Sequence, residues 1–159
     1  MKTRVLMVCL GNICRSPLAE GILRHQLKAA GLAAVVEVDS AGTSGWHAGE
    51  QPDKRSAANA RNHGVEISML RARQFVADDF DRFDEIYVMD SENLSNVRSL
   101  ARSEQDLQKT DLLLNQLHPG QNRAVPDPYF GGEEGFELVY QLVNDACAVL
   151  VNRYQQKHN

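Results

Sequence analysis

The feature that most constrains the fold is a strand, a tight loop and a helix that follow one another within the first 31 residues. Residues 5–8 form a continuous apolar run, which is typical of a strand buried on both faces of a parallel sheet. Residues 9–16 interrupt that run with a glycine and an asparagine. Pro17 suits the first turn of a helix, with Ser16 as its predicted N-cap, and helical spacing of apolar side chains continues to a stop at Gly31. This unit predicts an α/β protein.

Strands and helices alternate along the rest of the chain. Apolar runs predict strands at 35–38, 85–89 and 111–114, and helical spacing predicts helices at 53–62, 91–101 and 133–154. Asp90 or Ser91 is expected to cap the helix at 91–101. Segments 39–52 and 119–132 contain the glycines and prolines of loops. The alternation predicts a parallel sheet in one domain, residues 1–159, with ligands bound beyond the carboxyl ends of the strands.

The loop after the first strand carries the chemistry. It reads Cys9-Leu10-Gly11-Asn12-Ile13-Cys14-Arg15-Ser16. Backbone N–H groups of a tight loop can converge on a phosphate, and the following helix adds its positive end. Gly11 and Asn12 most readily take the left-handed conformations that such a loop requires. Arg15 offers a planar fork for two phosphate oxygens, and Cys9 would lie beneath the phosphate, where the same field stabilises a nucleophilic thiolate.

Other interpretations of this loop are weaker. A cysteine at the end of a buried strand can be an inert apolar side chain, but the spacing to Arg15 and the Gly-Asn pair between them favour a reactive Cys9. The loop lacks G-x-x-x-x-G-K-[ST] and G-x-G-x-x-G, the patterns of nucleotide-binding loops. The sequence therefore predicts a phosphoryl-transfer site with a cysteine nucleophile.

Three motifs resemble one known family. The segment from Cys9 to Pro17, with Leu-Ala-Glu after it, resembles the signature of the low-molecular-weight protein tyrosine phosphatases. Segment 125–129, Val-Pro-Asp-Pro-Tyr, resembles the family's general-acid loop, and segment 39–43 with Trp46 resembles the part that supports the phosphate loop. The resemblance implies hydrolysis of phosphotyrosine through a phosphocysteine intermediate. It also implies a flavodoxin-like three-layer sandwich with a parallel sheet of strand order 2-1-3-4.

The same resemblance assigns the catalytic roles. Asp127 alone could mark a simple turn between two prolines, but beside the loop it is interpreted as the general acid. It would protonate the leaving phenolate and later activate the water that hydrolyses phosphocysteine. Cys9, Arg15, the loop amides and Asp127 cover every step, so neither a metal nor another cofactor is expected.

Other loop and cleft residues are expected to bind substrate or support the loop. By resemblance the Ser16 hydroxyl bonds the Cys9 sulfur, and Asn12 hydrogen-bonds Ser40. Trp46 and Tyr129 could be ordinary aromatic residues, but are expected to wall a cleft deep enough to reject phosphoserine. The predicted substrate-binding set is Leu10, Gly11, Asn12, Ile13, Cys14, Ser16, Trp46 and Tyr129.

Cys14 has two interpretations. It could only fill space, or it could form a reversible disulfide with Cys9 that protects the nucleophile from over-oxidation. Cys147 falls at the apolar spacing of the last helix and is expected in the core. His47, next to Trp46, could shape the entrance of the cleft but is expected on the surface. Some relatives carry a histidine near 68–71 that braces the loop; segment 66–74 of this chain has none, and its role stays unassigned.

Three rival functions remain. A protein arginine phosphatase on the same fold carries threonine where this chain has Ile13, whereas a bulky apolar side chain suits an aryl phosphate. An arsenate reductase needs two further relay cysteines, but only Cys147 lies beyond the loop. A non-catalytic phosphate-binding or redox-sensing module has no use for Asp127.

The bulk composition limits partners and compartment. A net charge of −4 argues against nucleic acid as a partner. No apolar run approaches the roughly 18 residues of a transmembrane helix, the apolar start is too short for a signal peptide, and the three cysteines do not suggest a secreted disulfide framework. We expect a cytoplasmic monomer or weak dimer, with no membrane partner, that acts on a phosphotyrosine-containing protein or peptide.

Overall fold

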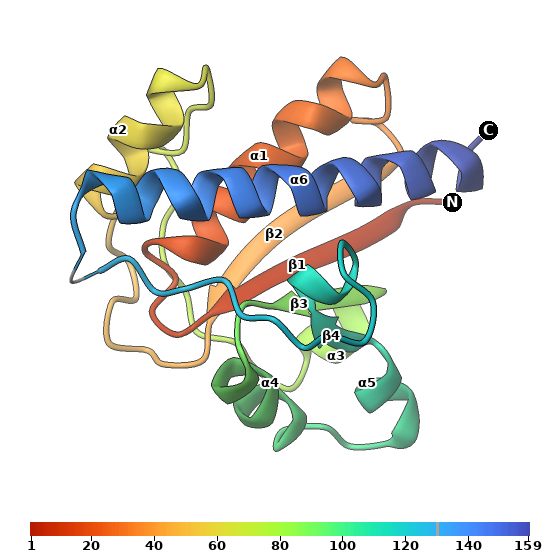
Figure 1. Ribbon diagram of the computed structural model, residues 1–159. Coiled ribbons are helices and arrows are strands. Elements are labelled where there is room, and N and C mark those ends of the chain that lie inside the picture. The colour runs from red at the N-terminus through yellow and green to blue at the C-terminus, as the bar shows by residue number, and fades with distance from the viewer. Residues whose placement is uncertain (130) are drawn as a thin grey trace.

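A parallel sheet forms the centre of the protein (Figure 1). The computed structural model describes residues 1–129 and 131–159. The four strands lie in the order β2-β1-β3-β4, as predicted. They are β1 (Thr3–Cys9), β2 (Val36–Gly42), β3 (Glu85–Val88) and β4 (Thr110–Leu112).

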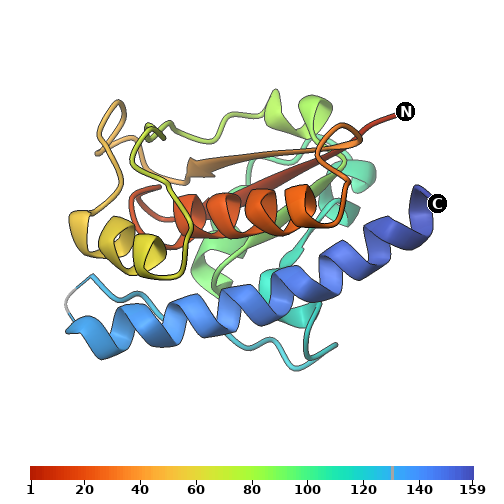
Figure 2. The ribbon, with the colours of Figure 1, turned by 90° about the horizontal axis from the view of Figure 1, so that it is seen from above.

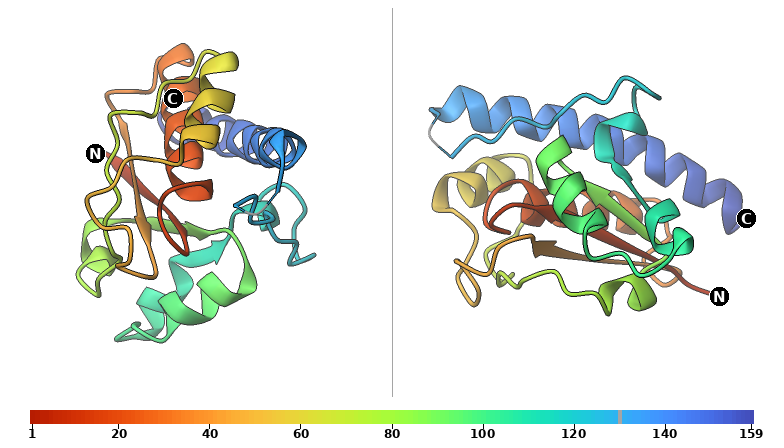
Figure 3. Two further views of the ribbon diagram at one scale, coloured as in Figure 1. Left: turned by 90° about the vertical axis from the view of Figure 1, so that its left-hand side faces the viewer. Right: turned by 90° about the horizontal axis from the view of Figure 1, so that it is seen from below.

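Helices cover both faces of this sheet. They are α1 (Arg15–Ala29), α2 (Lys54–Asn62), α3 (Asp79–Arg82), α4 (Ser91–Arg98), α5 (Glu104–Gln108), the 3-10 turn η1 (Leu113–Asn115) and α6 (Glu133–Lys157). Helices α1, α2 and α6 gather on one side of the sheet (Figure 3), and α6 lies along α1 (Figure 2). The predicted three-layer sandwich is therefore confirmed.

Alternating side chains of β1 enter two separate cores. Val5, Met7 and Cys9 belong to the core shared with α1 and α6. Leu6 and Val8 belong to the other core, beneath α3 and α4. A strand with both faces buried must be apolar at every position, which explains the continuous run in the sequence. Cys147 is fully buried in the first core, as expected.

The pairing of the strands brings several loops to one edge. Cys9 is the register partner of Gly42, and Val8 is the partner of Val88. Because all strands are parallel, the segments after β1, β2 and β3 leave the sheet at the same edge. The loop after β1 is therefore flanked by residues that follow β2 and β3.

Several predicted boundaries were wrong. Helix α1 begins at Arg15 rather than at Pro17, and Ser16 is not its N-cap, because the hydroxyl bonds groups inside the fold instead. Residues 39–42 continue β2 rather than forming a loop, because β1 is long enough to pair with them. Residues 113 and 114 turn into η1 after β4. The short helices α3 and α5 were not predicted.

The other predicted elements are present, although α4 ends at Arg98 rather than at residue 101. Asp90 caps α4 as expected, accepting a hydrogen bond from the Asn93 N–H at 2.8 Å. Helix α6 has 25 residues and runs three residues beyond the predicted end at 154. No helix among the described residues is long and apolar enough to cross a membrane.

Candidate active site

The loop after β1 curls around the sulfur of Cys9. The side chain of Cys9 is 3 % exposed, so it lies at the bottom of the loop. The Asn12 N–H donates to the Cys9 Sγ at 3.3 Å, and the Ser16 hydroxyl lies 3.1 Å from the same sulfur. Two polar groups thus point at the sulfur, and both can stabilise it as an anion.

Asn12 holds the loop in its curled shape. Its φ of 57° lies in the left-handed region, which asparagine tolerates better than most residues. Gly11 has no positive φ, so the prediction that both residues are left-handed was wrong for Gly11. Glycine gives close packing there, since a Cβ at that position would lie 3.0 Å from His47 Cδ2 and the imidazole would have to shift.

The Asn12 amide is hydrogen-bonded on all sides. Its Nδ2 donates to Ser16 Oγ at 2.7 Å and to Ser40 Oγ at 3.0 Å, so the bond expected between Asn12 and Ser40 is present. Its Oδ1 accepts from the Arg73 N–H at 3.0 Å. A buried polar side chain with every group satisfied favours one conformation. The left-handed turn is therefore held by contacts from α1, β2 and segment 66–74.

The network ends on a buried carboxylate. Ser40 Oγ donates to Glu20 Oε1 at 2.6 Å, and Arg24 pairs with the other oxygen at 2.6 Å. Glu20 is 3 % exposed, and burial raises its pKa above the ordinary range. The sequence analysis assigned Glu20 no role. Two signals pointed to a function near the loop: Glu20 ends the segment that resembles the family signature, and it lies one helical turn after Ser16.

Arg73 takes the bracing position in segment 66–74. Its guanidinium bonds Asp39 at 3.0 Å and the fully buried Asp79 at 3.0 Å. These pairs hold the segment beside β2, where Gly42 N–H donates to Arg73 O at 2.8 Å. The chain thus supports the loop through a backbone N–H of Arg73, without the histidine that some relatives carry near 68–71.

Arg15 lies beside the loop with its guanidinium fixed. Its Nη1 donates to Asp90 Oδ2 at 2.7 Å and to Val125 O at 2.9 Å. Its Nη2 lies 3.8 Å from Asp127, and the side chain is 3 % exposed. One end of the fork is therefore anchored and the other faces Asp127. Asp90 was expected only as a helix cap; its second carboxylate oxygen makes this ion pair.

The segment around Asp127 is tied to the end of β3. The Val125 N–H donates to Met89 O at 2.8 Å, and the Tyr129 N–H donates to Asp127 Oδ1 at 3.0 Å. The Asp127 carboxylate is about half exposed, so it can exchange protons with water. The fold brings Asp127 to Arg15 across more than a hundred residues of sequence.

A cavity of about 190 Å³ lies over the loop. Its lining residues are Cys9, Leu10, Gly11, Ile13, Cys14, Arg15, Trp46, His47, Asp127 and Tyr129. Of the predicted substrate-binding residues only Asn12 and Ser16 do not line it; they lie behind the loop. Trp46 and Tyr129 are both exposed, by 80 % and 38 %, so they form the rim.

His47 is the one lining residue of this cavity that the predicted site did not include. It was expected on the surface, and its side chain is in fact 31 % exposed. Its ring nevertheless lines the cavity, and its Nδ1 lies 2.9 Å from Glu50 Oε2. Its position next to Trp46 was the signal, because a short loop carries neighbouring side chains to one place.

Cys14 lies in the same loop but is buried. It is 5 % exposed and packs with Ile13, Ala72 and Phe136. Burial, with a smaller contribution from Asp53, raises the pKa of this thiol far above its ordinary range. Cys9 and Cys14 are both free thiols in this structure.

Fold and site together define an α/β phosphatase with a cysteine–arginine phosphate loop. The family model for low molecular weight phosphotyrosine protein phosphatase matches residues 4–159. A putative low molecular weight protein-tyrosine-phosphatase of Synechocystis is 43 % identical, over 93 % of this chain and 94 % of the relative. The crystal structure of YfkJ from Bacillus subtilis superposes with a TM-score of 0.91 at 37 % identity, covering 100 % of this chain and 98 % of the other.

One further relative agrees in family, and one further structure agrees in fold. A low molecular weight protein-tyrosine-phosphatase of Streptomyces coelicolor is 43 % identical over 95 % of this chain and 93 % of its own. A Drosophila arginine phosphatase superposes with a TM-score of 0.87 at 34 % identity, covering 97 % of this chain and 98 % of the other. The chain belongs to the low molecular weight phosphotyrosine protein phosphatase family, and its activity is that of a protein-tyrosine-phosphatase.

Proposed function

We propose that Cys9 attacks the phosphorus of a phosphotyrosine side chain and becomes a phosphocysteine. One observation carries this proposal: the Cys9 sulfur, the Arg15 guanidinium and the Asp127 carboxylate line one cavity. A nucleophile, an anion-binding fork and a proton donor are the three groups that hydrolysis of a phosphomonoester requires.

The loop would bind the phosphate before any bond changes. The first turn of the 15-residue helix α1 follows the loop directly, so its positive end adds to the field of the loop amides. Arg15 would grip two oxygens of the phosphate with the end of its fork that faces Asp127. Asp90 and Val125 hold the other end, so little side-chain entropy is lost on binding.

In the first step the Cys9 thiolate forms a sulfur–phosphorus bond and the bond from phosphorus to the tyrosine oxygen breaks. Protonated Asp127 gives its proton to that leaving oxygen, so a neutral phenol departs. In the second step the Asp127 carboxylate removes a proton from water. The water oxygen bonds to phosphorus, the sulfur–phosphorus bond breaks, and the thiolate returns to its hydrogen bonds with Ser16 and Asn12.

The rim would select the phenyl ring. Trp46 and Tyr129 offer aromatic faces above the loop, and Ile13 adds apolar surface inside the cavity. Phosphoserine is too short to bring its phosphorus to a sulfur at that depth. Phosphoarginine is the second candidate substrate, because of the similarity to the Drosophila arginine phosphatase.

Kinetic comparison of three peptides tests the substrate class. Phosphotyrosine, phosphoserine and phosphoarginine peptides of one sequence should rank with phosphotyrosine first in kcat/KM. A faster reaction with phosphoarginine would favour the second candidate. Acid quenching during turnover, followed by mass spectrometry, should find the added phosphate on Cys9.

Cys9→Ser tests the nucleophile. The variant should still bind a phosphotyrosine peptide, because the loop amides and Arg15 remain, but it should not turn over. Measurable hydrolysis by this variant would rule out the covalent mechanism.

Cys9 and Cys14 are proposed to form a protective disulfide under oxidation. Peroxide would convert the Cys9 thiolate to a sulfenic acid, and the Cys14 thiol would displace water from it to form the sulfur–sulfur bond. Inactivation of the wild type by peroxide should then be reversed by a thiol reductant. The mass of the protein should fall by two hydrogens on oxidation and return to its original value on reduction. Cys14→Ser should be inactivated irreversibly; equal recovery of both proteins would disprove the role of Cys14.

The setting of this activity is also proposed. The family model spans residues 4–159, which supports one phosphatase domain over residues 1–159. We place this domain in the cytoplasm as a monomer or weak dimer acting on phosphotyrosine-containing proteins, with no nucleic acid or membrane partner. Light scattering over a range of protein concentrations tests the oligomeric state.

A further inference from the structure

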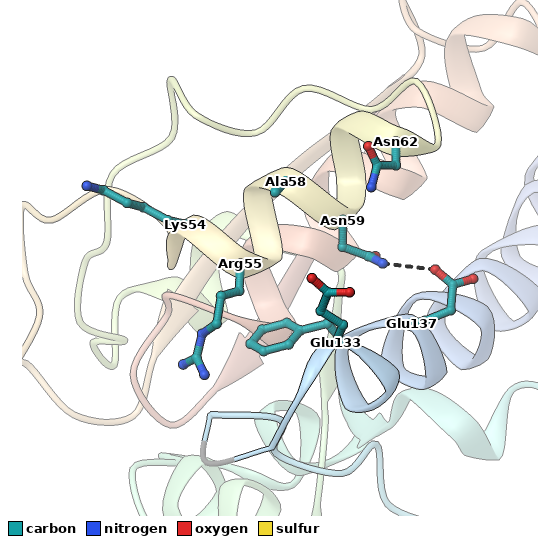
Figure 4. Close-up of a pocket in the computed structure, with 8 residues that line it drawn as sticks. Lys54, Arg55, Ala58, Asn59, Asn62, Glu133 and Glu137 are labelled. Carbon is teal, nitrogen blue, oxygen red and sulfur yellow. Dashed lines mark hydrogen bonds between the residues drawn. The ribbon is translucent and has the colours of Figure 1, made fainter.

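A second cavity lies between α2 and the first turns of α6 (Figure 4). Its volume is about 420 Å³. We call it the α2–α6 groove; its lining residues are Lys54, Arg55, Ala58, Asn59, Asn62, Glu133, Phe136 and Glu137. None of these residues takes part in the chemistry described above.

The groove shares a wall with the catalytic cavity. Arg55 Nη2 donates to Tyr129 O at 2.7 Å, and its guanidinium carbon lies 5.5 Å from the centre of the Tyr129 ring. The same carbon lies 4.8 Å from the centre of the Phe136 ring, which packs against Ile13 and Cys14 of the loop. A chain that leaves the rim at Tyr129 and crosses Arg55 therefore enters the α2–α6 groove.

The groove carries polar groups without partners. Among residues 1–129 and 131–159, the side chains of Lys54 and Glu133 have no ion-pair or hydrogen-bond partner. The Asn59 side chain donates to Glu137 at 2.9 Å, but its Oδ1 is buried without a partner within the described chain. A buried acceptor without a donor is unfavourable. At its surface the groove offers one cation and one carboxylate to a ligand.

We infer that the α2–α6 groove binds the part of the substrate polypeptide that flanks the phosphotyrosine, with an acidic side chain of that peptide at Lys54 and a basic one at Glu133. This inference rests on the proposed function. Helix α2 has nine residues and is about 14 Å long, which an extended peptide crosses in about four residues. The recognised charges thus lie within a few residues of the phosphotyrosine.

Charge reversal on both enzyme and peptide tests the inference. The peptides carry one phosphotyrosine and an acidic, a basic or a neutral flank, on either side of it. The enzymes are wild type, Lys54→Glu and Glu133→Lys. Each value of kcat/KM is divided by that for p-nitrophenyl phosphate, which is too small to reach the groove, so that folding or loop defects cancel.

Lys54→Glu should lower the normalised kcat/KM for the peptide with the acidic flank by about three- to tenfold. Glu133→Lys should lower the normalised kcat/KM for the peptide with the basic flank by the same factor. This is the size expected when an exposed attractive ion pair becomes a repulsive one. The controls Lys28→Glu and Glu134→Lys make the same charge changes at exposed positions outside the groove. Their peptide preferences should match the wild type.

Equal preferences in groove variants and controls would overturn the inference while leaving the phosphatase intact. Groove variants that alter self-association but not peptide preference would overturn it too, and would make the groove an interface between copies of this chain. If the wild type does not hydrolyse p-nitrophenyl phosphate, the proposed function itself is wrong.

Discussion

Replacing Asp90 with asparagine should separate the positioning of Arg15 from the stability of the fold. The two oxygens of Asp90 act independently: Oδ1 caps α4 through the Asn93 N–H, and Oδ2 accepts from Arg15 Nη1 at 2.7 Å. Asparagine is as good a cap as aspartate, so the first contact survives. The second becomes an amide facing a guanidinium, and two donors repel one another.

The size of the effect follows from the exposure of the pair. Arg15 is 3 % exposed and Asp90 is 26 % exposed, so water can replace part of the lost contact. A hydrogen bond to a charged group contributes about 1.5–3 kcal/mol, and we take about 2 kcal/mol for this pair. Because about 1.4 kcal/mol corresponds to a factor of ten, kcat/KM for an aryl phosphate should fall about 30-fold.

The matched variant is Asp90→Ala. It should lose the same activity and, in addition, about 1 kcal/mol of stability through the missing helix cap. Steady-state kinetics with p-nitrophenyl phosphate and urea unfolding of both variants measure the two effects. If Asp90→Asn stays within about twofold of the wild type while Asp90→Ala loses activity, the carboxylate acts only through α4 and this account of Arg15 is wrong.

Two further predictions concern protons. Asp127→Asn should slow hydrolysis most for phenols of high pKa, and equal losses across a series of leaving groups would remove Asp127 as the acid; the exposed Asp145→Asn is the control. Hydrogen bonds from Gln141, His63 and Asn59 lower the pKa of Glu137 from 4.5 to about 2, so its contribution to stability is present above pH 4.5 and lost as the pH falls toward 2. Because Glu137 is exposed, the loss should stay below about 1 kcal/mol, and Glu137→Gln should flatten it in urea unfolding at several pH values.

The elements that the sequence predicts well are those whose pattern depends on local chemistry. The run at 5–8 is apolar because both faces of β1 are covered, and Asp90 is a good cap by itself. The loop at 9–16 is recognisable because its cysteine, asparagine and arginine are needed in one short stretch. Asp127 was found by resemblance to a family motif, since nothing in its immediate sequence distinguishes it from a turn.

The parts that the sequence did not predict depend on contacts between distant residues. Residues 39–42 became a strand because β1 offers partners for them, whatever their own preferences. Ser16 lies where a cap is expected, but its hydroxyl makes hydrogen bonds with Cys9 and Asn12 instead of with the start of the helix. Asp90, Glu20 and Arg73 act on the loop through side-chain or backbone groups brought from other elements, and no local pattern marks such a meeting.

Helix α6 joins two distant parts of the molecule. It supplies Phe136 to the underside of the loop, and its far end bonds the first strand through His158 and Thr3 at 2.9 Å. The same helix thus supports the catalytic loop near one end and the start of the sheet at the other, so the support of the loop depends on how α6 docks against the sheet.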